Sequence, residues 1–254
     1  MNEKILKTKS NGFAALFSIL LLLILSVVGF ISSIALIRNE GLQVVCILLC
    51  ILVFIGSLML FGGLKVVKPQ EAIVLTLFGE YTGSIKEPGF YFVNPFSVAV
   101  NPAAKTKLGQ SGDVDRQSTP VTISTTGGVE ANLNALNKQI SLKIMTLNNS
   151  RQKINDCLGN PVEIGIAVTW RVVDTAKAVF NVDNYKEYLS LQCDSALRNI
   201  VRIYPYDVAP NVDTTGDGIA DEGSLRGSSE VVAKRIRDEI QARVENAGLE
   251  IIEA

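Results

Sequence analysis

The stretch from Asp213 to Asp221 has the residue types and spacing that come nearest to a metal-binding loop. Asp213, Asp217 and Asp221 stand at the first, fifth and ninth positions of a calcium loop, and Gly218 stands where such a loop turns sharply. The twelfth position, which would supply a bidentate glutamate, is Ser224. The pattern therefore favours a solvated acidic turn, with calcium binding as the alternative.

The sequence contains no recognisable set of catalytic residues. There is no histidine, which excludes Ser-His-Asp catalysis, Cys-His catalysis and histidine-ligated zinc. The four cysteines make neither a C-x-x-C motif nor a disulfide framework, and Cys46 and Cys50 are expected to be lipid-facing or packed thiols rather than acylation sites. No G-x-S-x-G pattern supports a serine nucleophile, which leaves a Ser-Lys hydrolase as a distant alternative. We expect a protein that is not an enzyme, without catalytic residues, cofactor or bound metal.

The composition indicates a membrane segment followed by a folded region. The chain has 254 residues, of which 48% are hydrophobic and 19% charged, and its mean hydropathy is +0.29. Nearly all of the apolar excess lies before Leu64, and the rest suffices for one sizeable domain or two small ones. The formal net charge of −1 divides into +2 for residues 1–64 and −3 for the rest, so nucleic acid is not an expected partner.

Two uncharged apolar runs, residues 10–37 and 41–64, follow a basic tail over residues 1–9. Each run exceeds the roughly 20 residues that a helix needs to cross a bilayer, which predicts a transmembrane helical hairpin rather than a cleavable signal peptide. The lysines that flank the two runs are Lys4, Lys7, Lys9, Lys65 and Lys68. The positive-inside rule then predicts a multi-pass protein of the plasma (inner) membrane with both ends in the cytoplasm.

Alternating apolar residues predict strands beyond the hairpin. They cover residues 71–79, 90–93, 140–145 and 162–172, and the alternation from Val162 to Val172 is strict enough to predict one continuous strand. In the third strand, Ile140, Leu142 and Ile144 are expected to share one face. A turn is predicted at Glu80–Gly83.

Helices are predicted after the last of these strands. Asp174 is the expected N-cap of a short helix through Phe180, and Asn184 opens a longer one that ends at Tyr204-Pro205. A final helix runs from about residue 228 to Gly248, with a strand after it. Strands followed by helices predict an α+β fold, with a polar insertion near residues 104–138.

Short sequence blocks beyond residue 64 have a recognisable order and spacing. They are Val67–Val74, Phe78–Gly83, Pro88–Phe90, Asn94–Phe96, Asn155–Ile164, Val168–Ala178, Tyr204–Asp207, Ser224–Gly227 and Ala247–Ala254. Together they resemble the stomatin–prohibitin–flotillin (SPFH, or Band 7) domain, in its bacterial branch with an N-terminal hairpin.

The resemblance implies an SPFH domain of antiparallel strands and helices over residues 65–254, lying against the membrane. It implies a non-enzymatic scaffold that forms homo-oligomers on the lipid bilayer and organises membrane microdomains, or controls the access of membrane proteins to a membrane protease. Two rivals stay open: an extracytoplasmic regulator of a membrane protease, and a calcium- or small-ligand-binding membrane protein that uses the 213–221 loop. Family members usually continue past the equivalent of Ala254 into a long helical region. We therefore expect either a truncated chain, or assembly through the domain and hairpin alone.

Six residues just beyond the hairpin are candidates for contact with the membrane interface, where aromatic rings are favoured. The alternative for the aromatic residues is that they fill the core of a small β-unit. The six are Lys65, Lys68, Phe90, Tyr91, Phe92 and Phe96.

Overall fold

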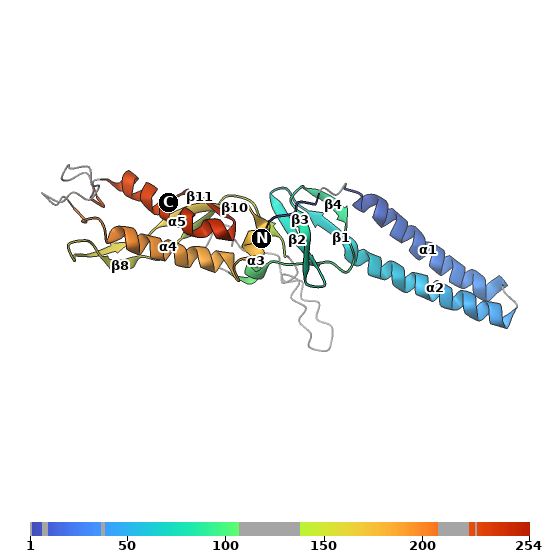
Figure 1. Ribbon diagram of the computed structural model, residues 1–254. Coiled ribbons are helices and arrows are strands. Elements are labelled where there is room, and N and C mark those ends of the chain that lie inside the picture. Colours follow the sequence, from blue (N-terminus) through green and yellow to red (C-terminus); the bar gives the residue numbers. More distant parts are fainter. Residues whose placement is uncertain (1, 7–9, 37–38, 107–137, 208–223, 227) are drawn as a thin grey trace. The chain divides into compact units, whose positions relative to one another are not determined.

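A computed structural model describes residues 2–6, 10–36, 39–106, 138–207, 224–226 and 228–254 (Figure 1). Most of the expected insertion near 104–138 and the whole Asp213–Asp221 loop lie outside the described residues. The chain divides into two compact units, and each is described by itself. The first unit is Lys4–Val100; the second is Asn101–Ala254 together with Met1–Glu3. Helices and antiparallel sheets are both present, which confirms the predicted α+β class.

The first unit begins with an antiparallel pair of long apolar helices. They are α1 (Gly12–Leu36) and α2 (Glu40–Leu60), which lie side by side in Figure 1, and α2 continues into the short helix η1 (Phe61–Gly63). The two helices coincide with the predicted spans to within a few residues. Asn39 begins α2 as its N-cap, because its side-chain oxygen accepts a hydrogen bond from the backbone N–H of Leu42.

Five strands complete the first unit. They are β1 (Leu64–Val67), β2 (Glu71–Leu77), β3 (Glu80–Ile85), β4 (Gly89–Phe92) and β5 (Val98–Ala99). Strand β1 pairs with β4, and a second sheet has the order β3-β2-β5, with every one of these pairings antiparallel. The core between them consists of Val67, Ile73, Leu75, Ile85 and Tyr91.

The connection between β2 and β3 differs from the predicted turn at Glu80–Gly83, which was wrong. Leu77 pairs with Glu80, so the loop consists of Phe78 and Gly79 alone, with φ angles of 49° and 93°. Positive φ at both loop residues is the geometry of a type I′ turn, whose twist matches that of the paired strands. Phenylalanine is rarely found at the first position of this turn, which is why the pattern did not predict it.

In the described residues of the second unit there are a three-stranded sheet, a separate hairpin and three α-helices. Its elements are η2 (Pro102–Lys105), β6 (Ile140–Ser141), β7 (Met145–Asn148), β8 (Gln152–Asn155), β9 (Pro161–Ile164), β10 (Ala167–Val172), α3 (Thr175–Phe180), α4 (Tyr185–Val201), α5 (Ser229–Val244), η5 (Glu245–Ala247) and β11 (Leu249–Glu253). The sheet has the order β11-β10-β7, and β8 pairs with β9. Helices α4 and α5 lie side by side (Figure 1), and the hydroxyl of Tyr188 donates to the Arg243 carbonyl at 3.1 Å.

The predicted helix caps of the second unit are confirmed. The carboxylate of Asp174 accepts a hydrogen bond from the Lys177 N–H at 2.9 Å and begins α3, and Asn184 begins α4 in the same way. Helix α4 ends at Val201, a few residues before the predicted Tyr204-Pro205. Gly248 follows η5 with a φ of 68°, the left-handed conformation that ends a helix at little cost only in glycine.

The single strand predicted from Val162 to Val172 is wrong, because the structure divides it into β9 and β10. The break falls at Gly165 and Ile166, where the N–H of Asn149 donates to the Ile166 carbonyl at 3.0 Å. Strand β9 then pairs with β8, whereas β10 pairs with β7 and β11. The period-two burial continues through the break, so the alternation alone could not reveal the change of partner.

The strand predicted at residues 140–145 has the wrong phase. Met145 and Leu147 are buried in β7, whereas Ile144 is 59% exposed. The chain bends between Ser141 and Met145, which shifts the alternation by one residue. Since side chains alternate between the two faces of a strand, a shift of one residue exchanges the buried and exposed sets.

The loop between β8 and β9 is held by the buried carboxylate of Asp156. One carboxylate oxygen accepts the backbone N–H groups of Leu158 (2.9 Å) and Asn160 (2.7 Å), and the other accepts the Asn160 side-chain amide and the Tyr206 N–H, both at 3.0 Å. Burial raises the pKa of Asp156, but these hydrogen bonds outweigh burial and hold the pKa below its ordinary value of 3.8. The ionised carboxylate therefore ties the loop to the segment after α4.

Candidate membrane interface

The surface of the α1–α2 hairpin is apolar along its length. Residues Gly12–Ala35 and Glu40–Gly63 are long and apolar enough to cross a membrane, and only 11% and 6% of their most apolar stretches are buried in the protein. Large side chains such as Phe17 and Leu52 are 69% and 71% exposed. A soluble protein rarely exposes so much contiguous apolar surface, so hydrocarbon is the surrounding that suits it.

Small residues form the contact between the two helices. Ser26 and Ser33 of α1 and Ser57 of α2 are buried, and a Cβ on Gly29 would lie 3.1 Å from the Cys50 sulfur. The hydroxyls of Ser26 and Ser57 donate to backbone carbonyls three residues earlier in their own helices, at 2.8 and 2.7 Å. Small side chains allow membrane helices to approach closely, and satisfied hydroxyls can remain away from water.

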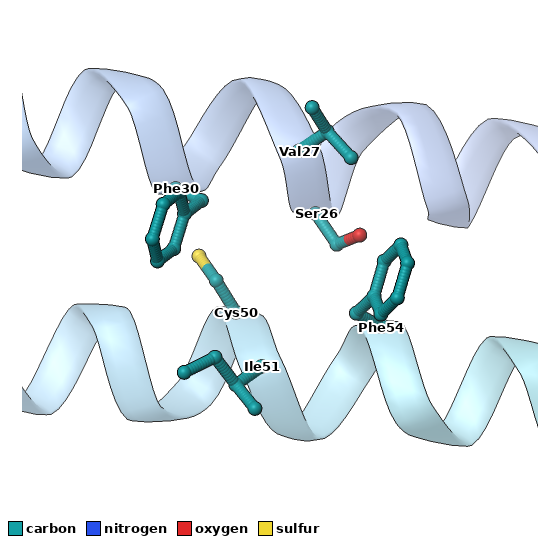
Figure 2. A pocket seen from close by; sticks show the side chains of 6 residues that line it. All are labelled: Ser26, Val27, Phe30, Cys50, Ile51 and Phe54. Atoms are coloured by element: carbon teal, nitrogen blue, oxygen red, sulfur yellow. The ribbon is translucent and has the colours of Figure 1, made fainter.

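A pocket of about 230 Å³ lies between α1 and α2 (Figure 2). It is lined by Ser26, Val27, Phe30, Cys50, Ile51 and Phe54. The lining is almost entirely apolar, and the Ser26 hydroxyl already donates within its own helix. This pocket suits hydrocarbon chains and offers no charged partner to a polar ligand.

Two glycines bring the base of the hairpin against the strands. A Cβ on Gly12 would lie 2.6 Å from the ring of Phe90, and one on Gly63 would lie 2.4 Å from the Val93 carbonyl oxygen. The Val93 N–H donates to the Gly63 carbonyl at 2.9 Å, and the ring of Phe13 meets that of Phe90 edge-on with centroids 5.2 Å apart. Both helix ends are therefore packed directly on β4 and the residue after it.

The structure separates the candidate interface residues. Tyr91 is only 2% exposed and donates its hydroxyl to the Glu87 carbonyl at 3.1 Å; burial, and then the charge of Glu87, raises its pKa. Tyr91 thus has the core position that the alternative interpretation predicted. Phe92 and Lys65 are half-buried, and Lys68 is exposed.

Phe96 belongs to an exposed aromatic pair that the sequence analysis did not find. The rings of Phe96 and Phe78 are stacked with centroids 6.3 Å apart and an interplanar angle of 25°. Phe78 is 87% exposed at the tip of the β2–β3 hairpin, and Phe96 is 53% exposed. A Cβ on Gly62 would lie 3.4 Å from the Pro95 carbonyl oxygen, so the loop that carries Phe96 lies beside the end of α2. We call Phe78 and Phe96 the aromatic pair.

Residues of the expected basic tail also take part in the first unit. The Leu6 N–H donates to the Ser84 carbonyl at 2.9 Å, and the Ser84 N–H donates to the Lys4 carbonyl at 2.8 Å. These bonds place Lys4–Leu6 parallel to β3. Since strands and tail are in one compact unit, the two ends of the α1–α2 hairpin lie at the same end of it.

In the described part of the chain, no group of three or more histidine, cysteine, aspartate or glutamate residues could hold a metal ion. Asp213, Asp217 and Asp221 lie outside the described residues, so calcium binding at that loop stays a prediction. The four cysteines are free thiols, of which Cys157 is exposed and Cys193 buried.

Comparison with known protein families matches residues 65–254 to the model of the SPFH domain / Band 7 family. The match begins in β1, directly after η1, and continues to the end of the chain. The chain belongs to the SPFH domain / Band 7 family. Two membrane-capable helices before an SPFH domain make it a membrane-associated protein of a scaffold type, in a family that is in general non-enzymatic. No curated protein matches the chain, so the family match alone supports this assignment.

Proposed function

We propose that this SPFH protein is a non-enzymatic integral membrane scaffold whose copies assemble. The assembled copies control which membrane proteins, such as a membrane protease, enter the patch of membrane between them. The observation that carries the proposal is the close packing of Gly12 on Phe90 and of Gly63 on Val93. Because Gly12 lies directly against Phe90 and Gly63 directly against the Val93 backbone, the β-unit is held at the base of its anchor. A unit held in this way lies along the headgroups and presents its sides to neighbours.

The domain is proposed to face the cytoplasm. Lysines flank both outer ends of the hairpin. Because Lys4–Leu6 pairs with β3, the residues before and after the hairpin lie on the same side of the bilayer, so the chain crosses the bilayer an even number of times if the helices span it. A reporter that is active only outside the cytoplasm, fused after Ile252, tests this. We expect no activity; full activity would favour the rival in which the domain regulates a membrane protease from the outer side.

The aromatic pair and Phe90 are the proposed contacts with the interface. An aromatic ring at the boundary between headgroups and acyl chains buries its face while its edge stays near water. Phe90 already packs on the first turn of α1, and the aromatic pair extends this apolar surface past the end of α2. Lys68 is exposed beside β1, within reach of anionic headgroups.

Assembly is tested on the full chain extracted in mild detergent. We expect light scattering coupled to size-exclusion chromatography to give a mass of many protomers after subtraction of the detergent. Chemical cross-linking in the native membrane before extraction controls for dissociation by detergent. A monomer in both experiments would overturn the scaffold proposal.

A further inference from the structure

The folded β-unit begins before the membrane hairpin rather than after it. We propose that Lys4–Leu6 is an integral strand of this unit, the clasp strand, so that the hairpin is an insertion between two strands of one compact β-unit: the clasp strand, which pairs with β3, and β1, which pairs with β4. The family match begins at residue 65 and does not include this strand. The inference uses the membrane anchoring proposed above, but it does not depend on the scaffold role.

The clasp strand pairs with an edge of β3. In the order β3-β2-β5 of the described strands, β3 stands at the end of the sheet, with β2 on its other side. Ser84 both donates to the Lys4 carbonyl and accepts from the Leu6 N–H, which is the pattern of a parallel strand pair. The Lys4 N–H also donates to the Tyr81 hydroxyl at 3.2 Å.

A specific position on β3 receives this strand. A Cβ on Gly83 would lie 2.6 Å from Leu6 Cγ and 2.9 Å from the Lys4 carbonyl oxygen, so a side chain at position 83 would collide with the clasp strand unless that strand shifted. The φ of Gly83, 155°, is also one that other residues rarely adopt. Leu6 packs against the core that contains Ile85 and Tyr91. A solvated tail would need neither the apolar packing of Leu6 nor a glycine at position 83 to make room for it.

The β-unit, with the clasp strand included, holds both ends of the hairpin. Helix α2 leads directly through η1 into β1, and α1 begins six residues after Leu6 with Gly12 against Phe90. The start of α1 and the end of α2 are therefore fixed by the same β-unit. Release of the clasp strand would free the first helix and leave the edge of β3 open to pairing with another chain.

A disulfide test uses the full chain in membranes. Ile5 and Ser84 are bridge partners, so an Ile5→Cys/Ser84→Cys chain should oxidise to an intramolecular disulfide. The matched control is Ile5→Cys/Glu80→Cys, in which the second cysteine lies four residues along β3, about 13 Å away. Peptide mapping without reduction distinguishes the engineered bridge from bonds made by the four native cysteines.

We expect at least tenfold more 5–84 than 5–80 bridge, and a further Gly83→Val change should lower the 5–84 yield at least tenfold. Equal yields for the two pairs, or bridges formed only between two chains, would overturn the clasp strand. The comparison of the two pairs does not depend on the folding of the Gly83→Val variant. Mass and membrane integration are measured on the same samples, so loss of the clasp alone leaves the scaffold proposal standing.

Discussion

Replacement of Asp156 by asparagine tests the tie between the β8–β9 loop and the segment after α4. Asparagine keeps one oxygen, which can still accept the N–H groups of Leu158 and Asn160. Its amide nitrogen would stand where the other oxygen now accepts the Tyr206 N–H and the Asn160 side chain. Two donors would then face a third donor in a buried position.

The expected loss follows from these two bonds. A hydrogen bond to a charged group contributes about 1.5–3 kcal/mol, and the exposed Asn160 amide can turn to water, so we expect Asp156→Asn to lower the free energy of unfolding by about 2–4 kcal/mol. Trp170 is the single tryptophan and is fully buried in the same unit, so its fluorescence during urea unfolding measures the change. The control is Asp183→Asn at an exposed site, expected to change stability by less than about 0.5 kcal/mol.

The pH dependence distinguishes the charge of Asp156 from its shape. Its folded pKa lies below the ordinary value of 3.8, so its stabilisation is complete above that value and is lost as pH falls through the folded pKa. The difference in unfolding free energy between wild type and Asp156→Asn should be constant from pH 7 to 5 and shrink below about pH 4. A difference that stays the same down to pH 3, or no difference at pH 7, would refute the reasoning.

Three further predictions concern the interface and the second unit. In a Trp170→Phe background, the fluorescence of a Phe78→Trp variant should be quenched by lipids that are brominated near the headgroups. The fluorescence of the buried Trp170 in the wild type should not be quenched. Equal quenching in the two proteins would show that Phe78 does not lie at the interface. Burial, and then the charge of Asp194, raises the pKa of Cys193 to about 12. At pH 8, iodoacetamide should therefore label the exposed Cys157 and leave Cys193 unlabelled until urea unfolds the protein. Peptide mass spectrometry measures the labelling of each cysteine. Gly248→Ala should lower the free energy of unfolding by about 2–4 kcal/mol, because its Cβ would lie 2.3 Å from a carbonyl oxygen; a loss below about 1 kcal/mol would contradict this contact.

Local signals accounted for the helices and their ends. The apolar runs that became α1 and α2 are long enough to be recognised without any knowledge of their neighbours. Asp174 and Asn184 were predicted as caps because a cap is a contact between residues three apart. The absence of histidine and of any nucleophile pattern is likewise a property of composition alone.

Strand partners were harder to predict because they depend on residues far away in the chain. The alternation from Val162 to Val172 is the same whether one strand or two are formed, and only the pairing with β8 or with β7 and β11 separates β9 from β10. The same difficulty hid the two-residue turn at Phe78 and Gly79, whose register depends on Leu77 meeting Glu80.

The sequence by itself determined that the chain has a membrane-capable hairpin, a following α+β domain and SPFH-type blocks, since these are properties of composition, periodicity and spacing. Only the tertiary structure decided that Tyr91 lies in the core while the aromatic pair is exposed, and that Lys4–Leu6 pairs with β3. The physical reason is that burial and strand pairing are set by which surfaces meet. Hydrophobicity and local propensity indicate that a residue can be buried or extended, but they do not name its partner.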